Sequence, residues 1–155
     1  MLTDLSRIVQ AFNVQEVSGE LYQGVNISPA QMIAAIVRDE VNKLVSLKWG
    51  LVPSWAKTPL VGNKMINARA ETVAEKPSFR QAFKRRRCLI VADGFYEWKM
   101  EGSKKTPLRF GLKSGAPFGL AGLYEIWHSL DKVPLKKRSD PSHTRPDACH
   151  CTEAG

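Results

Sequence analysis

Apolar positions in the first half of the chain predict one helix and one β-hairpin. The capping pair Thr3-Asp4 precedes apolar residues that recur at helical spacing from Leu5 to Phe12. Gln31–Val37 is an apolar segment typical of a buried strand, and Val45–Trp49 alternates between apolar and polar residues as a half-buried strand does. A polar turn joins these two segments, so we expect them to pair as an antiparallel hairpin.

The second half of the chain mixes a loop, a short helix and several strands. Residues 50 to 64 have no sustained period and predict a long surface loop. A short helix is expected around Ser78–Arg86. Strands are expected at Cys88–Ala92, Phe95–Trp98, Leu108–Phe110 and Leu120–Trp127. Because helices and strands do not alternate regularly, the pattern predicts a single α+β domain built on antiparallel sheet with short helices.

The chain changes character after residue 131. Between Lys136 and Gly155 there is no Ile, Leu, Val, Met or aromatic residue, so this segment buries too little apolar surface to offset the entropy of ordering it. We therefore expect the domain to occupy residues 1–131 and residues 132–155 to be a disordered tail. Cys149 and Cys151 are too closely spaced for a usual zinc site, so no metal or other cofactor is expected.

Composition indicates which partners and compartment suit the chain. The 155 residues include 23 Lys and Arg against 15 Asp and Glu, a formal net charge of +8 that favours a polyanionic partner such as nucleic acid. The charge gathers at Lys84–Arg87 and at Lys132–Arg138, each of which is either a solvated surface or a phosphate-binding one. No apolar segment is long enough to span a membrane, and we expect no signal peptide. Three cysteines cannot form a disulfide framework, which points to the reducing cytoplasm; we also expect a monomer.

Two short motifs contain polar side chains suited to catalysis or ligand binding. Glu97 has aromatic neighbours, between which a carboxylate can act as a general acid or base; alternatively, strand alternation points it to solvent, opposite Tyr96 and Trp98. The amide of Asn67 could orient a substrate and the guanidinium of Arg69 could bind phosphate. Alternatively, Asn67 caps a helix and Arg69 lies on its solvated face. On the residues alone, both pairs of interpretations stay open.

The loop that begins near residue 50 contains candidates for contacts with nucleic acid. Trp49, Pro53 and Trp55 lie near basic residues, and exposed Trp and Pro side chains can wedge against or stack on unpaired bases. Alternation makes Trp49 a core residue, whereas no strand period buries Trp55. Trp55 is therefore the better candidate for stacking, with Pro53 beside it.

Four motifs follow one another along the chain. They are Trp49-Gly-Leu-Val-Pro-Ser-Trp55, Ile66-Asn-Ala-Arg-Ala-Glu71, Arg87-Cys-Leu-Ile-Val-Ala-Asp-Gly-Phe-Tyr-Glu-Trp98 and Ala121-Gly-Leu-Tyr-Glu125. Together they resemble the SOS response-associated peptidase (SRAP) family, over a span from Thr3 to Asp131. The resemblance implies a mixed α/β fold with a positively charged channel for single-stranded DNA, and a role in DNA damage through crosslinking to abasic sites.

The same resemblance assigns roles to the candidate residues. In the family, removal of the initiator methionine exposes an N-terminal cysteine, which attacks the ring-opened abasic aldehyde to form a Schiff base and then a thiazolidine. By resemblance, Asn67 holds the sugar or the terminal amine, and Arg69 grips a phosphate. Glu97 shuttles protons and positions the amine. Trp55, with Pro53, lies against the damaged nucleotide.

The chain departs from the family pattern at both ends. Met1 is followed by Leu2-Thr3-Asp4 in place of the family's Met-Cys-Gly-Arg, and the block Ile-His-Asp-Arg-Met-Pro, which holds a catalytic histidine, is missing. Asp140–Cys151 can be encoded by codons that, read from the second base, give Ile-Arg-Pro-Ile-His-Asp-Arg-Met-Pro-Val-Ile. We therefore expect an N-terminal truncation and a frameshift between residues 131 and 140, and hence a domain incomplete at both ends.

Three functions follow from these observations. The first is the family's own: binding of abasic sites in single-stranded DNA, covalent crosslinking, and an autoproteolytic peptidase step. Lacking the N-terminal cysteine and the histidine, this chain is expected not to crosslink. The second function is that of a non-catalytic single-stranded DNA-binding module, and the third is that of a peptidase acting on other proteins.

Overall fold

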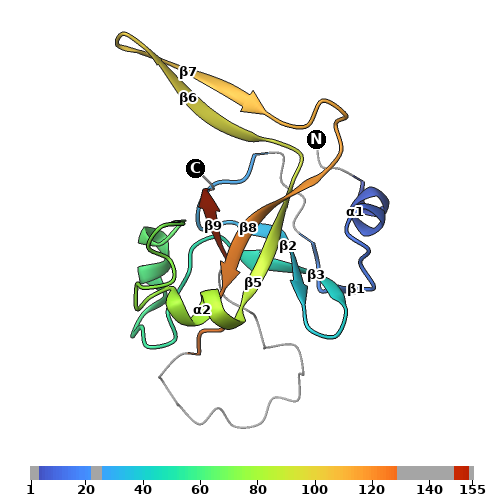
Figure 1. Cartoon of the computed structure of the whole chain (residues 1–155), viewed down its shortest axis with the longest axis vertical. Helices are drawn as coiled ribbons and strands as arrows, with labels where there is room; N and C mark the ends of the chain where they lie inside the picture. Colours follow the sequence, from blue (N-terminus) through green and yellow to red (C-terminus); the bar gives the residue numbers. More distant parts are fainter. Residues whose placement is uncertain (1–3, 22–25, 129–148, 154–155) are drawn as a thin grey trace.

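The computed structural model describes residues 4–21, 26–128 and 149–153 (Figure 1). In chain order the elements are α1 (Leu5–Ala11), β1 (Glu16–Ser18), β2 (Met32–Arg38), β3 (Asn42–Lys48), the 3-10 helix η1 (Pro59–Lys64), β4 (Asn67–Arg69), α2 (Arg80–Arg85), β5 (Arg87–Ala92), β6 (Phe95–Glu101), β7 (Lys104–Phe110), β8 (Phe118–Tyr124) and β9 (Cys149–Glu153). They form a seven-stranded sheet of order β1-β3-β2-β5-β8-β9-β4 and a two-stranded sheet of β6 and β7.

The main sheet is mixed, with an antiparallel centre. β2 pairs antiparallel with β3, from Met32 opposite Lys48 to Arg38 opposite Asn42, which confirms the predicted hairpin. The pairs β2–β5, β5–β8 and β8–β9 are also antiparallel, whereas β1 and β4 each join an edge of the sheet in parallel. The short helices and mainly antiparallel strands confirm the predicted α+β class. None of the helices in the described part is long and apolar enough to cross a membrane.

Strand β2 is buried on both faces, which explains its continuous apolar sequence. On one face, Ile33 and Ala35 pack with Leu47 and Ile90. On the other face, alternate β2 residues pack beneath α1, whose Ile8 is only 4% exposed. The aspartate that precedes α1 caps it, since the Asp4 carboxylate accepts a hydrogen bond from the Ser6 backbone N–H at 3.2 Å.

The segment from residue 50 to residue 64 is less of a surface loop than its sequence predicts. Leu51, Val52 and Pro53 are buried, and the segment ends in η1. Leu51 joins a cluster with Ala68 and other residues under α2, so tertiary packing, rather than any local period, accounts for its burial. The strand predicted to end at Trp127 also ends early, because β8 stops at Tyr124.

The predicted disordered tail is described only in part. The predicted boundary at residue 131 and residues 132–148 lie outside the described residues. Residues Cys149–Glu153 form β9, which pairs with β8 on one side and β4 on the other. The lack of large apolar side chains does not prevent this pairing, because a sheet ladder is made by backbone N–H and C=O groups.

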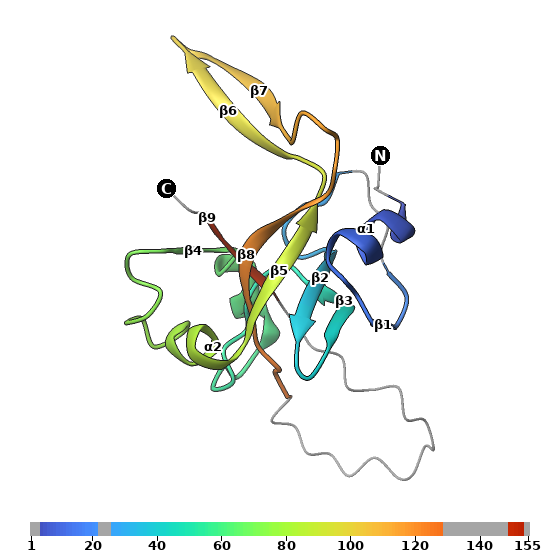
Figure 2. The ribbon, with the colours of Figure 1, turned by 45° about the vertical axis from the view of Figure 1, so that its right-hand side comes forward.

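The β6–β7 hairpin projects from the end of the main sheet. It rises where β5 ends and β8 begins, and it leans toward the side on which β9 lies (Figures 1 and 2). Phe95 at its base stacks on Phe110 with ring centroids 5.4 Å apart, and meets Phe118 edge-on at 6.4 Å. These aromatic contacts link the hairpin to the first residue of β8.

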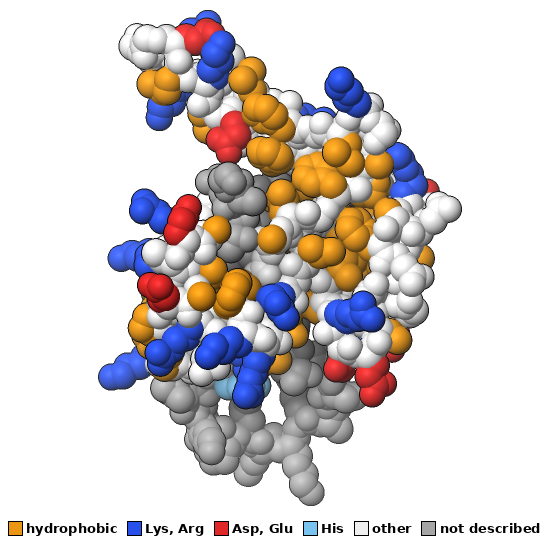
Figure 3. Space-filling view, in the orientation of Figure 1, with side chains coloured by type: hydrophobic (Ala, Val, Ile, Leu, Met, Phe, Trp, Pro, Cys, Tyr) orange, Lys and Arg blue, Asp and Glu red, His pale blue; other side chains and the backbone are white. Residues whose placement is uncertain are grey.

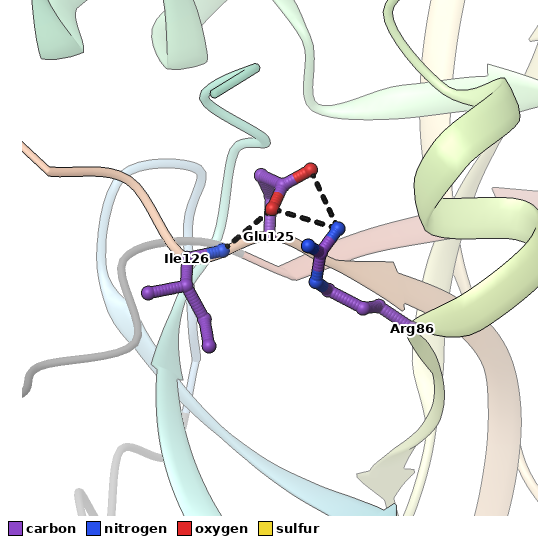
Figure 4. A network of polar contacts seen from close by, with 3 residues as sticks. All are labelled: Arg86, Glu125 and Ile126. Carbon is purple, nitrogen blue, oxygen red and sulfur yellow. Dashed lines mark hydrogen bonds and ion pairs between the residues drawn. The ribbon is translucent and has the colours of Figure 1, made fainter.

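The opposite end of β5 is fixed by a charged pair. The Arg86 Nη1 lies 2.9 Å from Oε1 of Glu125 and 3.1 Å from its Oε2 (Figure 4). Oε1 also accepts a hydrogen bond from the Ile126 backbone N–H at 3.0 Å. The Glu125 side chain is 5% exposed and that of Arg86 is 32% exposed, so the pair is accessible to water from the arginine side. It fastens the end of α2 to the end of β8.

Replacing Arg86 with Met is expected to destabilise the fold, because it leaves the buried Glu125 carboxylate without its cation. We expect a loss of about 1–3 kcal/mol in the free energy of unfolding, measured by urea denaturation. The adjacent Arg85 is exposed and provides the control, since Arg85→Met should change stability by less than about 0.5 kcal/mol. Equal losses in the two variants would contradict an anchoring role for the pair.

Candidate nucleic-acid interface

Strand β4 presents two polar side chains on one face. Asn67 and Arg69 are exposed, while Ala68 between them is 4% exposed and packs in the core. Because side chains alternate along a strand, the amide and the guanidinium point to the same side. The alternative in which Asn67 caps a helix is wrong, since residues 67 to 69 form a strand that pairs with β9.

The segment that contains Trp55 is held by hydrogen bonds at several points. The indole N–H of Trp49 donates to the Ile66 carbonyl at 2.9 Å, next to β4. The indole N–H of Trp127 donates to the Ala56 carbonyl at 2.8 Å, next to Trp55 itself. Trp49 is partly buried against the core, as its alternation predicts. The hydrogen bonds of the two indoles thus fix the segment to the chain beside β4 and to the chain after β8.

Trp55 and Pro53 differ sharply in exposure. The Trp55 side chain is 61% exposed, so its ring is available for stacking. Pro53, by contrast, is fully buried. Its burial differs from the prediction that it contacts DNA, because a ring without exposed surface cannot lie against a base. Pro53 instead belongs to the buried part of the segment that contains Trp55.

A close backbone contact also fixes this segment. Gly50 has a φ of +129°, and a Cβ placed on it would lie 2.5 Å from the Gly62 carbonyl oxygen. A Cβ on Gly62 would in turn lie 2.8 Å from the Gly50 carbonyl oxygen. The two backbone segments on either side of Trp55 therefore approach each other as closely as two glycines allow.

Glu97 lies on β6 of the two-stranded sheet, whereas β4 belongs to the seven-stranded sheet. It pairs with Leu108, and strand alternation places it on the hairpin face opposite Tyr96 and Trp98, as the solvent-facing interpretation predicts. Among the hydrogen bonds and ion pairs of the described residues, none joins Glu97 to Asn67 or Arg69. The structure thus brings Asn67 and Arg69 together on one strand and leaves Glu97 on the neighbouring hairpin, which leans toward the β9 side (Figure 2).

The hairpin carries an aromatic and basic face that the sequence motifs did not single out. Cross-strand pairs place on one face the side chains of Tyr96, Trp98, Met100, Lys105, Pro107 and Arg109. Trp98 is 62% exposed and Tyr96 54%. Arg109 is held at the hairpin base by the Asp93 carboxylate at 3.3 Å and the Asp93 carbonyl at 3.0 Å. Alternation along residues 95 to 101 was the available signal for this face.

The described residues contain no cluster of three or more His, Cys, Asp or Glu that could hold a metal ion. Cys149 and Cys151, whose close spacing argues against zinc, lie on β9. The polar groups on β4 and on the hairpin are an amide, guanidinium groups and a carboxylate. These groups suit contacts with phosphate, sugar and base.

The fold thus defines a class of protein. It is a mixed α+β sheet domain that exposes an asparagine and an arginine on one strand and a tryptophan on the preceding segment. The family model for SOS response associated peptidase (SRAP) matches residues 1–144. The chain belongs to the SRAP family.

Individual relatives agree with this assignment. The chain is 45% identical over 139 residues to the abasic site processing protein YoqW of Bacillus subtilis. The matched region covers 87% of this chain and 62% of that protein. It is 48% identical over 132 residues to the abasic site processing protein YoaM of the same organism, and this match covers 83% of the chain and 58% of YoaM. The chain thus spans about three-fifths of the length of these relatives. A crystal structure of a protein from Bordetella bronchiseptica matches with a TM-score of 0.70 at 30% identity, covering 83% of this chain and 63% of that one.

Replacing Gly50 with Ala is expected to disturb the segment that carries Trp55, because the new Cβ meets the Gly62 carbonyl. We expect a loss of about 2–4 kcal/mol in the free energy of unfolding, measured by urea denaturation. Gly102→Ala is the matched control: its φ is also positive, at +62°, but a Cβ there meets nothing within 4 Å. If the two variants lose the same stability, the close contact has no effect of its own.

Proposed function

We propose that this chain binds single-stranded DNA at abasic sites. Arg69 binds a backbone phosphate, Asn67 contacts the baseless sugar, and Trp55 occupies the space left by the missing base. The names of the relatives, which are abasic site processing proteins, support this choice of ligand.

The observation that carries the proposal is the pair of exposed polar side chains on β4. Among the described residues, no hydrogen bond or ion pair engages the side chains of Asn67 and Arg69, and the strand that bears them is fixed by the burial of Ala68 and by its pairing with β9. A guanidinium on an ordered strand suits bidentate phosphate binding, because the backbone is already fixed and the planar fork can donate two parallel hydrogen bonds. An amide two residues away offers a donor and an acceptor to a sugar hydroxyl or aldehyde.

Trp55 provides the second part of the proposed site. Its exposed ring projects from a segment held by the Trp49 and Trp127 indoles and by the Gly50–Gly62 contact. A base-sized aromatic ring that is already positioned can fill the gap opposite an abasic sugar and stack on the neighbouring base. The rigidity of the segment lowers the ordering cost of that contact.

Glu97 is proposed as the carboxylate that serves the covalent chemistry of the family, by moving protons at the sugar aldehyde. That chemistry needs an N-terminal amine and thiol, and the 155-residue polypeptide has cysteines only at positions 88, 149 and 151, of which Cys88 is buried. We therefore propose that this polypeptide, tested as it stands, binds abasic DNA without a covalent crosslink.

A second candidate function is single-stranded DNA binding without preference for abasic sites. The aromatic and basic face of the hairpin favours it, because Tyr96 and Trp98 can stack on any base while Arg109 meets the backbone. The two functions differ in one measurable quantity, the ratio of affinities for abasic and intact strands.

The test measures binding of the whole chain to a fluorescent single strand with one abasic site and to the intact strand. Arg69→Gln should weaken binding to both strands about 10- to 100-fold, as loss of a charge-assisted phosphate contact does. Asn67→Ala and Trp55→Ala should lower the abasic-to-intact ratio. A denaturing gel should show no covalent adduct.

Arg7→Gln is the matched control for charge, since Arg7 is exposed on α1, which packs on β2 and β3 at the other end of the sheet order from β4, and it should leave both affinities unchanged. A wild-type ratio near unity, unaffected by Asn67→Ala, would favour the general DNA-binding module. An adduct that survives denaturation would overturn the non-covalent assignment.

A further inference from the structure

We propose that the outer face of α2, with the start of β5, is a second contact for single-stranded DNA, which binds a flank several nucleotides from the abasic site. This inference rests on the proposed function for the choice of ligand. Every charged residue from Lys76 to Arg87 is basic. In the space-filling view, Lys and Arg side chains gather over α2 (Figure 3).

The helix places basic and aromatic side chains on one stripe. Arg80, Phe83 and Lys84 are spaced by three and four residues, so they lie on one side of α2, while Phe79 and Ala82 are buried. Phe83 is 38% exposed between the two cations. A stacking ring beside phosphate-binding groups is the combination with which proteins bind single strands.

Helix stability does not explain all of these charges. Lys84 and Arg85 lie in the last turn, where cations are favourable, but Arg80 is the first helical residue, where a cation opposes the helix dipole. No acidic residue occupies that first turn. Among the described residues, Arg86 is the one member of this set that forms an ion pair. Arg80, Phe83 and Lys84 are exposed to solvent.

Strand β5 extends the stripe. Arg87 is opposite Leu123 in the sheet, and Leu123 packs with Ala82 in the cluster beneath α2. Paired residues of antiparallel strands share a face, so the exposed Arg87 lies on the side of the sheet that α2 covers. Three cations and one ring, at Arg80, Phe83, Lys84 and Arg87, therefore belong to one continuous surface, here called the α2 surface.

The α2 surface and the β4 site are separated by the sheet itself. Strand pairing leads from Asn67 through Cys151 and Gly122 to Cys88, so three strand spacings, about 14 Å, separate Asn67 from the start of β5. Ala68 packs beneath α2, so Asn67 and Arg69 point to the other face. A DNA strand that binds both the β4 site and the α2 surface must pass around the edge of the sheet at β4. It therefore needs a flank longer than about four phosphates beyond the abasic site.

The test compares abasic oligonucleotides of two lengths, about 8 and about 25 nucleotides, with the abasic site near one end. Wild-type protein should bind the longer strand more tightly. The double variant Arg80→Gln/Lys84→Gln should lose most of that gain, keep its affinity for the short strand, and show a salt-dependence slope smaller by about 1.4. Phe83→Ala should reduce the gain without changing the slope, because stacking releases no counterions.

The control double variant Arg7→Gln/Lys113→Gln removes the same charge from exposed positions near α1 and should behave as wild type. If Arg80→Gln/Lys84→Gln keeps the full length gain and slope, the α2 surface does not bind DNA. That result is distinct from failure of the proposed function, in which the abasic-to-intact ratio of the wild type is near unity whatever the strand length.

Discussion

The pairing of β5 with β8 is the interaction on which the rest of the structure depends. Its one end receives α2, through the Arg86–Glu125 pair and through the hydrogen bond from the Tyr124 N–H to the Arg86 carbonyl at 2.9 Å. Its other end continues into the β6–β7 hairpin. The same two strands join the β2–β3 side of the sheet to the β9–β4 side. Any change in their register would therefore displace the hairpin, the helix and β4 together.

Local patterning in the sequence predicts the centre of this fold well. Gln31–Val37 is apolar throughout because β2 is buried on both faces, and that signal needs no knowledge of its neighbours. The segment after Trp49 shows the opposite case. Leu51 and Pro53 are buried by residues distant in sequence, and no periodicity records such contacts. The three residues of β4 are likewise too few to show a period.

The candidate site divides in the same way. The motif around Asn67 and Arg69 identified residues that the fold exposes together, although the residues alone left a helix equally possible. The placement of Glu97 on a different sheet from this pair was not foreseeable, because it depends on how the hairpin leaves the main sheet. Nor did the local pattern reveal the indole hydrogen bonds of Trp49 and Trp127, since each indole N–H meets its acceptor carbonyl only in the folded chain.

The position of β4 has a consequence for how the molecule assembles. Its sheet partner is β9, which lies about eighty residues further along the chain, and closing so long a loop is entropically costly. Strands β1, β2, β3, β5 and β8 find their partners among one another, whereas the described sheet gives β4 no partner other than β9. Among the described strand pairs, the one that completes the surface bearing Asn67 and Arg69 thus closes the longest stretch of chain, so that surface depends on the least local contact in the sheet.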